Sequence, residues 1–307
     1  MNPIVPANVR DRTGSAGILR RALADIRRRF AALERDAVAI FRSIRVVASN
    51  DASGPGARTV YAMTPEEMAA VSQALRDALD RRIASGREPA AAFWWSAYDA
   101  EAAQLGTAQS VSNLTRLSAA YAATRTLQTV LFSEPYRTRV GMAQIKSYDH
   151  WTGLSAGMRA ELSQIIGRAV ADGKNQRAVV AEIRERLGVG KAQAMQYAQT
   201  DITDTLRQAR WAEAERAEDD LGLRLALLWT SALIPTTRPW HASRHGKVYT
   251  PAEVRAFYSQ RGNRYRCHCS QTETLLGDDG LPVLSDGLKR SMVAERRAWD
   301  GAQEASP

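Results

Sequence analysis

The His and Cys residues of this chain are few and are concentrated near its C-terminal end. The sequence has four His and two Cys, and three of the His lie with both Cys between residues 241 and 269. Neutral imidazole and thiolate are the ligands that zinc prefers, so this grouping predicts a metal site. The four ligands expected of such a site are His241, His245, Cys267 and Cys269.

Local geometry can bring these ligands together. Pro239 can open a helical turn on which His241 and His245 share a face, while Cys267 and Cys269 would share one face of a strand. A structural zinc ion would then tie the segment around residue 240 to the last strand and support folding. The Cys-x-Cys spacing is shorter than is usual for zinc, and the alternative is that both cysteines are small buried strand residues. No other cofactor is expected.

Motifs of the common enzyme classes are absent from the sequence. It has no phosphate-binding loop, no dinucleotide-binding glycine pattern and no Gly-x-Ser-x-Gly turn. A hydrolytic zinc site also needs a general base, and Glu253 and Glu273 are the acids closest in sequence to the predicted ligands. We therefore predict a protein without enzymatic activity. The alternative is a zinc-dependent nucleic-acid-processing enzyme that uses His241, Cys267 and Cys269.

The excess of basic residues is confined to two segments. The chain carries 42 Lys and Arg against 33 Asp and Glu, a net charge of +9. Residues 1–50 and residues 238–266 each have a net charge of +6, so the rest of the chain is close to neutral. The second segment is interleaved with aromatic residues, which suits phosphate contact and base stacking. Its predicted nucleic-acid-binding residues are Arg238, Arg244, Lys247, Arg264 and Arg266. The alternative is a solvated loop whose Arg side chains pack over a small sheet.

Length and composition are those of a globular protein with room for two domains. The 307 residues are 45% hydrophobic and 24% charged, which excludes a largely disordered chain. No apolar run reaches the roughly 20 residues of a membrane span, and the start of the chain lacks the pattern of a secretory signal. Two cysteines one residue apart exclude a disulfide scaffold, so we expect an intracellularly made protein that does not bind membranes.

The first half of the chain is predicted to be helical. Between residues 15 and 47 the apolar residues step by four and three, as in a heptad seam. The residues of this seam are Ile26, Phe30, Leu33, Ala37, Ile40 and Ile44. Gly54-Pro55-Gly56 predicts a break, and Thr64-Pro65-Glu66-Glu67 has the form of a capping box that begins a second helix ending near Gly86. A third helix is expected from about Pro89.

The second half is predicted to continue with helices and to end in strands. Helices are expected over residues 155–172, 175–187 and 190–220, with Gly173 and Gly188 at their ends. The predicted strands span residues 224–231, 247–250 and 264–276, and residues 277–280 form a hairpin-type turn. We therefore expect an α+β fold that is mainly α, in which a long helical N-terminal half precedes a helical block and a small antiparallel sheet.

Five segments of the second half occur in an order that resembles a known family. They are the helix Tyr197–Arg210, Leu228-Trp229-Thr230-Ser231, Thr237-Arg238-Pro239-Trp240-His241, Gly246-Lys247-Val248 and Asn263-Arg264-Tyr265-Arg266-Cys267-His268-Cys269. This series is similar to that of phage Mu F-like minor head proteins, also called head-morphogenesis proteins, over roughly residues 155–285. The sequence departs from the family at Gln199-Thr200-Asp201, where relatives have Arg-Thr-Glu, and at Leu233-Ile234-Pro235, where relatives have an Asp.

The resemblance implies a minor structural component of a phage head. Such a protein would lie inside the capsid near the portal, would assist head assembly and DNA packaging or delivery, and would be in the host cytoplasm during assembly. Its expected partners are the portal protein, other head proteins and double-stranded DNA bound without sequence preference. Residues 1–150 would form an Arg-rich helical region that binds the portal, residues 151–285 the Mu F-like domain, and residues 286–307 a polar tail.

The Arg-rich first helix has two alternative roles. Its apolar seam predicts association with the portal or with a second copy of the chain through residues 26–44. Its Arg residues off the seam are equally suited to direct contact with DNA.

Overall fold

The computed structural model describes residues 2–49, 58–84 and 93–304, and it is mainly α-helical with two small antiparallel sheets. This confirms the expected fold class. The chain divides into two compact units, each made of separate segments. Unit 1 comprises Met1–Arg20, Ala97–Ala143 and Gln199–Pro307, and unit 2 comprises Arg21–Ser96 and Gln144–Ala198. Because the helices α6 (Glu134–Asp172) and α7 (Gln176–Leu221) contribute to both units, the division in space does not follow the sequential one expected at residue 150.

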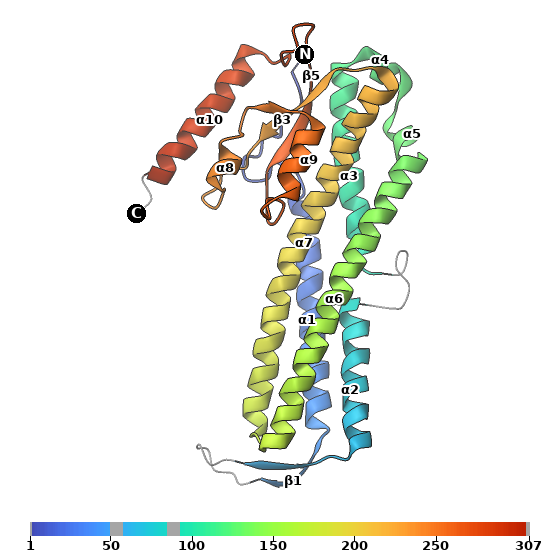
Figure 1. Ribbon diagram of the computed structural model, residues 1–307, viewed down its shortest axis with the longest axis vertical. Coiled ribbons are helices and arrows are strands. Elements are labelled where there is room, and N and C mark those ends of the chain that lie inside the picture. Colours follow the sequence, from blue (N-terminus) through green and yellow to red (C-terminus); the bar gives the residue numbers. More distant parts are fainter. Residues whose placement is uncertain (1, 50–57, 85–92, 305–307) are drawn as a thin grey trace. The chain divides into compact units, whose positions relative to one another are not determined.

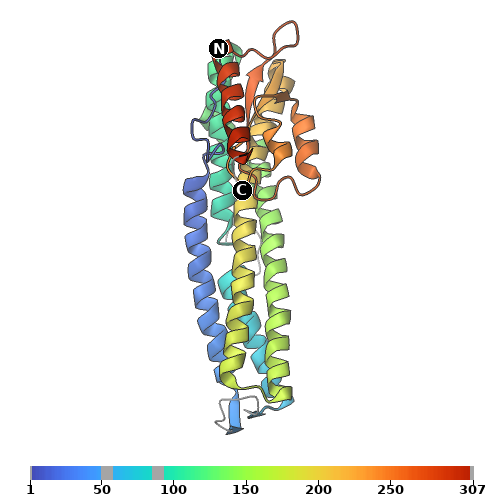
Figure 2. The ribbon, with the colours of Figure 1, turned by 90° about the vertical axis from the view of Figure 1, so that its left-hand side faces the viewer.

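Unit 2 is a bundle of four helical segments. From residue 21 onward α1 (Ala16–Arg42) runs beside α2 (Pro65–Leu79) and beside the parts of α6 and α7 that belong to this unit (Figures 1 and 2). Each segment turns its apolar stripe inward, as amphipathic helices do in a bundle. Buried members of this core are Ile26, Phe30, Leu33, Leu75, Leu79, Trp151, Met158, Leu162, Ile166, Val179, Ile183 and Leu187.

The predicted heptad seam lies in this core. Ile26, Phe30, Leu33, Ala37 and Ile44 are buried within the unit, and Ile40 is half-buried. The seam is therefore not a free surface for the portal or for a second copy, because the chain's own helices already cover it. Any association through residues 26–44 would have to use the exposed, Arg-bearing side of α1.

The first helix is shorter than predicted. It ends at Arg42, and Arg45–Ser49 form the strand β1, which pairs antiparallel with β2 (Thr59–Ala62). Val46 and Val47 favour extended backbone because they are β-branched. The hairpin is fixed to the rest of unit 2 because the Thr59 amide donates to the Gly173 carbonyl at 2.8 Å. The break predicted at residues 54–56 lies outside the described residues.

The capping box at Thr64 is confirmed, since Thr64 accepts from the Glu67 amide and the Glu67 carboxylate accepts from the Thr64 amide. The helix α2 ends at Leu79 and continues as a π-helical turn, η1 (Asp80–Ala84). The end predicted near Gly86 and the start near Pro89 lie outside the described residues. The next helix, α3 (Ser96–Leu117), begins later than the sequence suggested.

Two glycines predicted to end helices behave differently. Gly173 has a φ of +65° directly after α6, which is the left-handed conformation common after a helix end. By contrast, α7 runs without interruption through Gly188 and Gly190, where two helices were expected. A Cβ atom at Gly190 would lie 2.5 Å from the Met158 Sδ atom, so this glycine permits close helix packing. The break predicted at Gly188 is therefore wrong, and packing does not account for this glycine, because a Cβ atom there would meet no atom within 4 Å.

Unit 1 contains a three-stranded antiparallel sheet in the order β4-β3-β5. The strands β3 (Leu225–Thr230) and β4 (Val248–Tyr249) lie where predicted, whereas β5 spans only Ser270–Leu275. Residues 261–269 are turns and irregular backbone, with a φ of 51° at Arg266, so Cys267 and Cys269 precede the strand. The predicted turn at residues 277–280 is confirmed by the Gly280 amide, which donates to the Gly277 carbonyl.

The core of unit 1 joins this sheet to α3, the second half of α7 and α9 (Pro251–Ser259), and two short helices between α3 and α6 add Tyr121 and Val130. Its centre is a row of aromatic rings in which Tyr258 stacks on both Trp211 and Trp229, at centroid distances of 5.4 and 5.3 Å. Cys267 and Cys269 belong to the same buried cluster. The candidate site is therefore built into the core of this unit.

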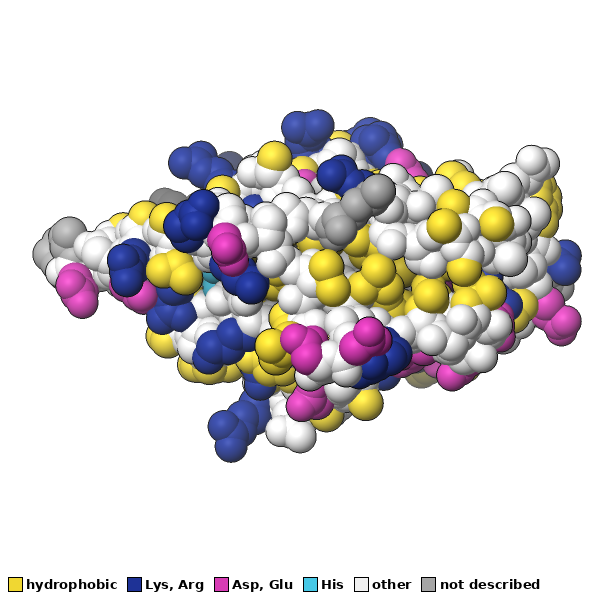
Figure 3. Space-filling model, turned by 90° about the horizontal axis from the view of Figure 1, so that it is seen from above, with side chains coloured by type: hydrophobic (Ala, Val, Ile, Leu, Met, Phe, Trp, Pro, Cys, Tyr) yellow, Lys and Arg dark blue, Asp and Glu magenta, His cyan; other side chains and the backbone are white. Residues whose placement is uncertain are grey.

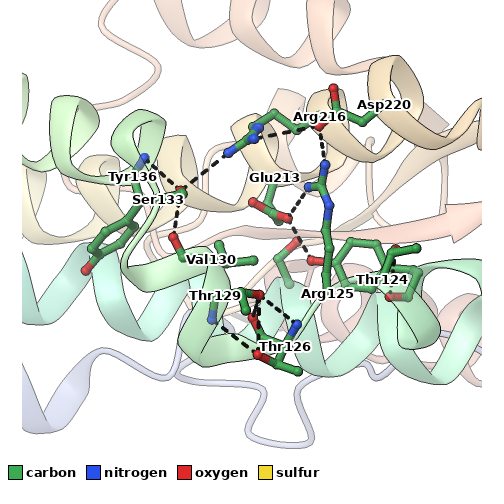
Figure 4. A network of polar contacts seen from close by, with 12 residues as sticks. Thr124, Arg125, Thr126, Thr129, Val130, Ser133, Tyr136, Glu213, Arg216 and Asp220 are labelled. Carbon is green, nitrogen blue, oxygen red and sulfur yellow. Dashed lines mark hydrogen bonds and ion pairs between the residues drawn. The ribbon is translucent and has the colours of Figure 1, made fainter.

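Polar contacts hold the short helices of unit 1 against α7. Arg125, which follows α4 (Ala119–Thr124), bonds the buried Glu213 at 2.9 Å and also pairs with Asp220 (Figure 4). Ser133, between α5 (Leu127–Leu131) and α6, accepts from Arg216. Each of these contacts joins residues that are more than eighty positions apart in the sequence.

The C-terminal helix α10 (Asp286–Glu304) occupies most of the segment that was expected to be a polar tail. Glu295 on this helix pairs with the buried Arg12, and the Trp299 indole donates to the Ile234 carbonyl at 3.1 Å. Most of the predicted tail is therefore a packed element of unit 1. Within the described residues, no helix is long and apolar enough to cross a membrane.

Candidate metal centre

Three of the predicted metal ligands meet in the core of unit 1. The Nδ1 atom of His241 lies 3.4 Å from the Sγ atom of Cys267 and 3.7 Å from that of Cys269. All three side chains are buried, with 2 to 5% exposure. The ligand atoms of all three residues lie within 4.8 Å of one another, and we call this group the His–Cys cluster.

Three local features position the cluster. Pro239 begins the short helix α8 (Pro239–Ala242), as predicted, and His241 lies on that helix. The Ser231 hydroxyl, directly after β3, donates to the His241 carbonyl at 2.6 Å, and the Phe257 ring packs edge-on against the imidazole. The left-handed backbone at Arg266 turns the chain so that Cys267 and Cys269 both face His241.

His245 does not join the cluster, so the predicted set of four ligands is wrong in one member. The helix α8 ends at Ala242, and His245 therefore lies beyond the turn that was expected to align it with His241. Its Nδ1 atom accepts from the Ser231 amide at 3.0 Å, and its Nε2 atom lies 3.4 Å from Glu295. Burial and the charges of Arg12 and Arg296 lower the pKa of His245 to about 4.

Arg207 is a site residue that the sequence reasoning missed. It is fully buried on α7 and donates to the carbonyls of Cys267 and Cys269, at 3.3 and 3.5 Å. Its guanidinium also lies over the Tyr258 ring, 4.3 Å from the centroid. One feature of the sequence could have indicated this role. Arg207 directly follows the buried Leu206 on α7, and an Arg among buried residues of a helix usually has a partner for its charge.

Arg207 makes the site favourable for thiolate. Burial alone would raise the pKa of Cys267, but the hydrogen bond from Cys269, the charge of Arg207 and the contact with His241 hold it well below its usual range. The hydrogen bond to Cys267, together with burial, raises the pKa of Cys269. Cys267 is therefore the more acidic of the two thiols, and it lies next to the charge of Arg207.

A cavity of about 270 Å³ opens beside the cluster. Two basic side chains, Arg238 and Arg266, contribute to its lining. The full lining consists of Ala232, Ile234, Thr236, Thr237, Arg238, His241, Arg266, Cys267, His268 and Cys269. None of these residues is Asp or Glu, so the cavity offers no carboxylate as a general base.

The two acids that the sequence placed near the cluster have other roles. Glu253 caps α9 by accepting from the Thr250 amide. Glu273 is fully buried on β5 and pairs with Arg210 at 3.1 Å, with further bonds from Ser110 and Asn113. The hydrolytic alternative therefore gains no support from either residue.

The five predicted nucleic-acid-binding residues are not equally available. Lys247 and Arg266 are exposed, whereas Arg244 lies over the Phe257 ring at 4.0 Å and is half-buried. Arg238 donates to the carbonyls of Asn263 and Tyr265 and to the Nε2 atom of His241. Arg264 is half-buried and stacks on Tyr265. Packing over the sheet thus accounts for much of this segment, as the alternative interpretation held.

The surface view agrees with this distribution. Figure 3 shows Lys and Arg side chains separated by uncharged and acidic ones on the face that it presents, with no continuous basic area. By contrast, α1 in unit 2 exposes several Arg residues along its length: Arg27, Arg28, Arg35 and Arg42.

Comparison with known proteins agrees with the motif series. Residues 160–272 match the family model described as Phage Mu protein F like protein. The matched range contains the whole His–Cys cluster and Arg207. No curated protein and no solved structure matches the chain. Residues 160–272 are therefore similar to the phage Mu F-like family, which confirms the resemblance that the order of the motifs predicted.

Proposed function

We propose that this protein is a non-enzymatic minor component of a phage head, located inside the capsid near the portal. The observation that carries the proposal is the family match over residues 160–272. The core of unit 1 is consistent with a structural role, because Glu253 and Glu273 are engaged in capping and in an ion pair. In this role the protein assists head assembly and the packaging or delivery of DNA.

The composition of purified heads tests the proposed location. Quantitative mass spectrometry of heads should find this protein at few copies relative to the major capsid protein. Heads assembled without the portal should lack it, whereas heads without the tail should keep it. Its absence from purified heads, or a copy number like that of the capsid protein, would contradict the proposal.

We also propose contact with double-stranded DNA that does not depend on sequence. Exposed basic residues occur in each unit by itself: Lys247 and Arg266 in unit 1, and several Arg residues of α1 in unit 2. Positive side chains release counterions when they neutralise phosphates, so such binding weakens with salt. With about four to six phosphates contacted, the logarithm of affinity should fall against the logarithm of salt concentration with a slope of about −4 to −5.

Charge-reversal variants separate specific contacts from net charge. Lys247→Glu and Arg266→Glu should each make the slope less steep by about one unit if the native side chain contacts a phosphate. Lys289→Glu on α10 is the matched control, because it changes net charge equally at an exposed residue outside both basic segments. A slope near zero for the native chain, or equal effects of all three variants, would contradict the DNA contact at residues 247 and 266.

A further inference from the structure

The His–Cys cluster has the dimensions of a metal site. With zinc–sulfur bonds of about 2.3 Å and zinc–nitrogen bonds of about 2.0–2.1 Å, a tetrahedral ion separates its sulfur and nitrogen ligands by about 3.6 Å. The two distances from His241 Nδ1 to the sulfurs are 3.4 and 3.7 Å. Both nitrogen–sulfur separations of the cluster are therefore close to those of a tetrahedral metal site.

The surroundings of the cluster hold its ligands in place. The Cys269 amide points at the Cys267 Sγ atom at 3.4 Å, and the Tyr258 hydroxyl lies 3.3 Å from the same sulfur. Arg207 fixes the carbonyls of both cysteines. Contacts of this kind orient ligands and stabilise negative sulfur, which is the role of the residues around known metal sites.

The ligand set selects the type of metal. Two thiolates and one imidazole are soft to borderline ligands, which favour zinc over magnesium or calcium. Closed structural zinc sites have four protein ligands, whereas the described residues gather three here. The remaining side of the cluster faces the cavity lined by Arg238 and Arg266.

We propose that His241, Cys267 and Cys269 bind one zinc ion whose fourth coordination position opens into this cavity. A water molecule or a small anion occupies the fourth position, and the two Arg residues of the cavity favour the anion. This site is distinct from a closed clasp that includes His245. It does not depend on the proposed role in the phage head.

Zinc binding has a consequence at Arg238. A guanidinium can only donate, and Arg238 lies 3.1 Å from the His241 Nε2 atom, so this contact is a hydrogen bond only while Nε2 carries no proton. When zinc takes Nδ1, the proton of the neutral ring is on Nε2 and the contact with Arg238 becomes one between two donors. The Arg238 side chain then keeps its bonds to the Asn263 and Tyr265 carbonyls and turns away from the ring.

Metal content and cobalt spectroscopy of the full chain test the proposal. The protein purified without chelator should contain one zinc per chain, as measured by elemental analysis. After replacement by cobalt(II), it should show thiolate-to-cobalt charge-transfer absorption and the visible bands of tetrahedral cobalt. A chain that contains no metal, and takes up neither zinc nor cobalt with these spectra, would overturn the proposal.

Variants and an added anion test the ligands and the open position. Cys269→Ser and His241→Gln should each weaken zinc retention against a competing chelator at least tenfold. His245→Gln, the matched control, should leave zinc retention unchanged, and a loss in this variant would overturn the three-ligand set.

Azide added to the native cobalt form should shift the visible bands, and an unchanged spectrum would overturn the open position. The measurements on the native chain decide the question even if a ligand variant does not fold.

Discussion

The two units bury different kinds of side chain. In the described part of unit 2 the buried polar residues are limited to small hydroxyl-bearing ones: Thr59, Ser96, Ser147 and Ser155. Unit 1 buries charged and imidazole side chains, including Arg207, Arg210, Glu213, Glu273 and His241. An apolar core is stabilised by contact area, so the cost of a change follows the volume removed. A core with buried charges depends on each partner being present, because an unpaired buried charge is far more costly than a small cavity.

The difference also indicates where a site can be built. The polar groups in the core of unit 1 are each held by defined bonds, and the His–Cys cluster is one part of this arrangement. Unit 2 offers no comparable group of ligands among its described residues. The described part of unit 2 is thus a helical bundle with an apolar core and with Arg residues on the exposed side of α1.

The largest effect is expected when the buried ion pair of unit 1 is broken. Glu273→Ala leaves Arg210 buried without its carboxylate, and we expect the unfolding free energy of unit 1 to fall by about 3–5 kcal/mol. Hydrogen exchange followed by mass spectrometry reports this for peptides of β3 and β5 separately from those of unit 2. The double variant Arg210→Met with Glu273→Leu should recover much of the loss, since it removes both charges.

An exposed ion pair serves as the control for this experiment. Asp25→Ala removes the partner of Arg28 on α1, where the Arg side chain is 73% exposed. We expect a loss below about 1 kcal/mol, because water and salt screen such pairs. Equal losses in the two variants would show that charge burial does not distinguish the units.

The next effect concerns the apolar core of unit 2. Leu33→Ala removes buried volume from the seam of α1 and should lower the unfolding free energy of unit 2 by about 2–5 kcal/mol. Leu33→Met conserves volume and should cost less than about 1.5 kcal/mol. Exchange protection of α6 and α7 peptides between residues 144 and 198 measures both. A small loss of unfolding free energy in Leu33→Ala would mean that the seam contributes little to the stability of the bundle. It would then favour the alternative that the seam is an interface with another protein.

Much of the fold could be predicted because it depends on local signals. The capping box at Thr64, the glycine after α6 and the strand at residues 225–230 follow from residue type and spacing alone. The errors arose where distant contacts override a local preference. Gly188 looks like a helix end, but α7 continues through it, and two residues later Met158 packs against Gly190.

The candidate site was predicted only in part, because residue types identify its ligands while distant contacts decide which of them meet. Residue type identified His241, Cys267 and Cys269, because the chain has only four His and two Cys. The exclusion of His245 depends on where α8 ends, and the role of Arg207 depends on contacts about sixty residues apart. Neither follows from periodicity, since the first is set by the loop after β3 and the second by how the segment before β5 packs against α7.

A third prediction concerns pH and distinguishes the units through His245. The unfolded chain protonates this His near pH 6.5, whereas burial and the charges of Arg12 and Arg296 lower its pKa to about 4 in the folded chain. The unfolded state therefore binds more protons between these values. We expect the unfolding free energy of unit 1 to fall by up to about 3 kcal/mol as the pH is lowered from 7 to 4.

Hydrogen exchange at several pH values, corrected for the intrinsic rate, measures this dependence for each unit. Glu295 lies 3.4 Å from His245, but its charge is taken up by Arg12. The variant His245→Gln keeps an acceptor for the Ser231 amide and should remove most of the pH dependence attributed to this residue. An equally steep dependence in this variant would assign the effect to other groups.

The smallest effect should be the same in both units. Thr64 and Thr250 form matching capping boxes at the starts of α2 and α9, each with Pro at the first helical turn. Both caps are exposed, so they depend on local hydrogen bonds and not on the kind of core beneath them. We expect Thr64→Ala and Thr250→Ala each to lower the unfolding free energy of the unit that contains the residue by about 1 kcal/mol.

Thr64→Ser and Thr250→Ser are the controls, because they retain the hydroxyl and should lower the unfolding free energy little. A loss several times larger for Thr250→Ala would show that α9 transmits the change to the Tyr258 ring and to the polar core of unit 1, so that even an exposed residue of this unit depends on its buried charges.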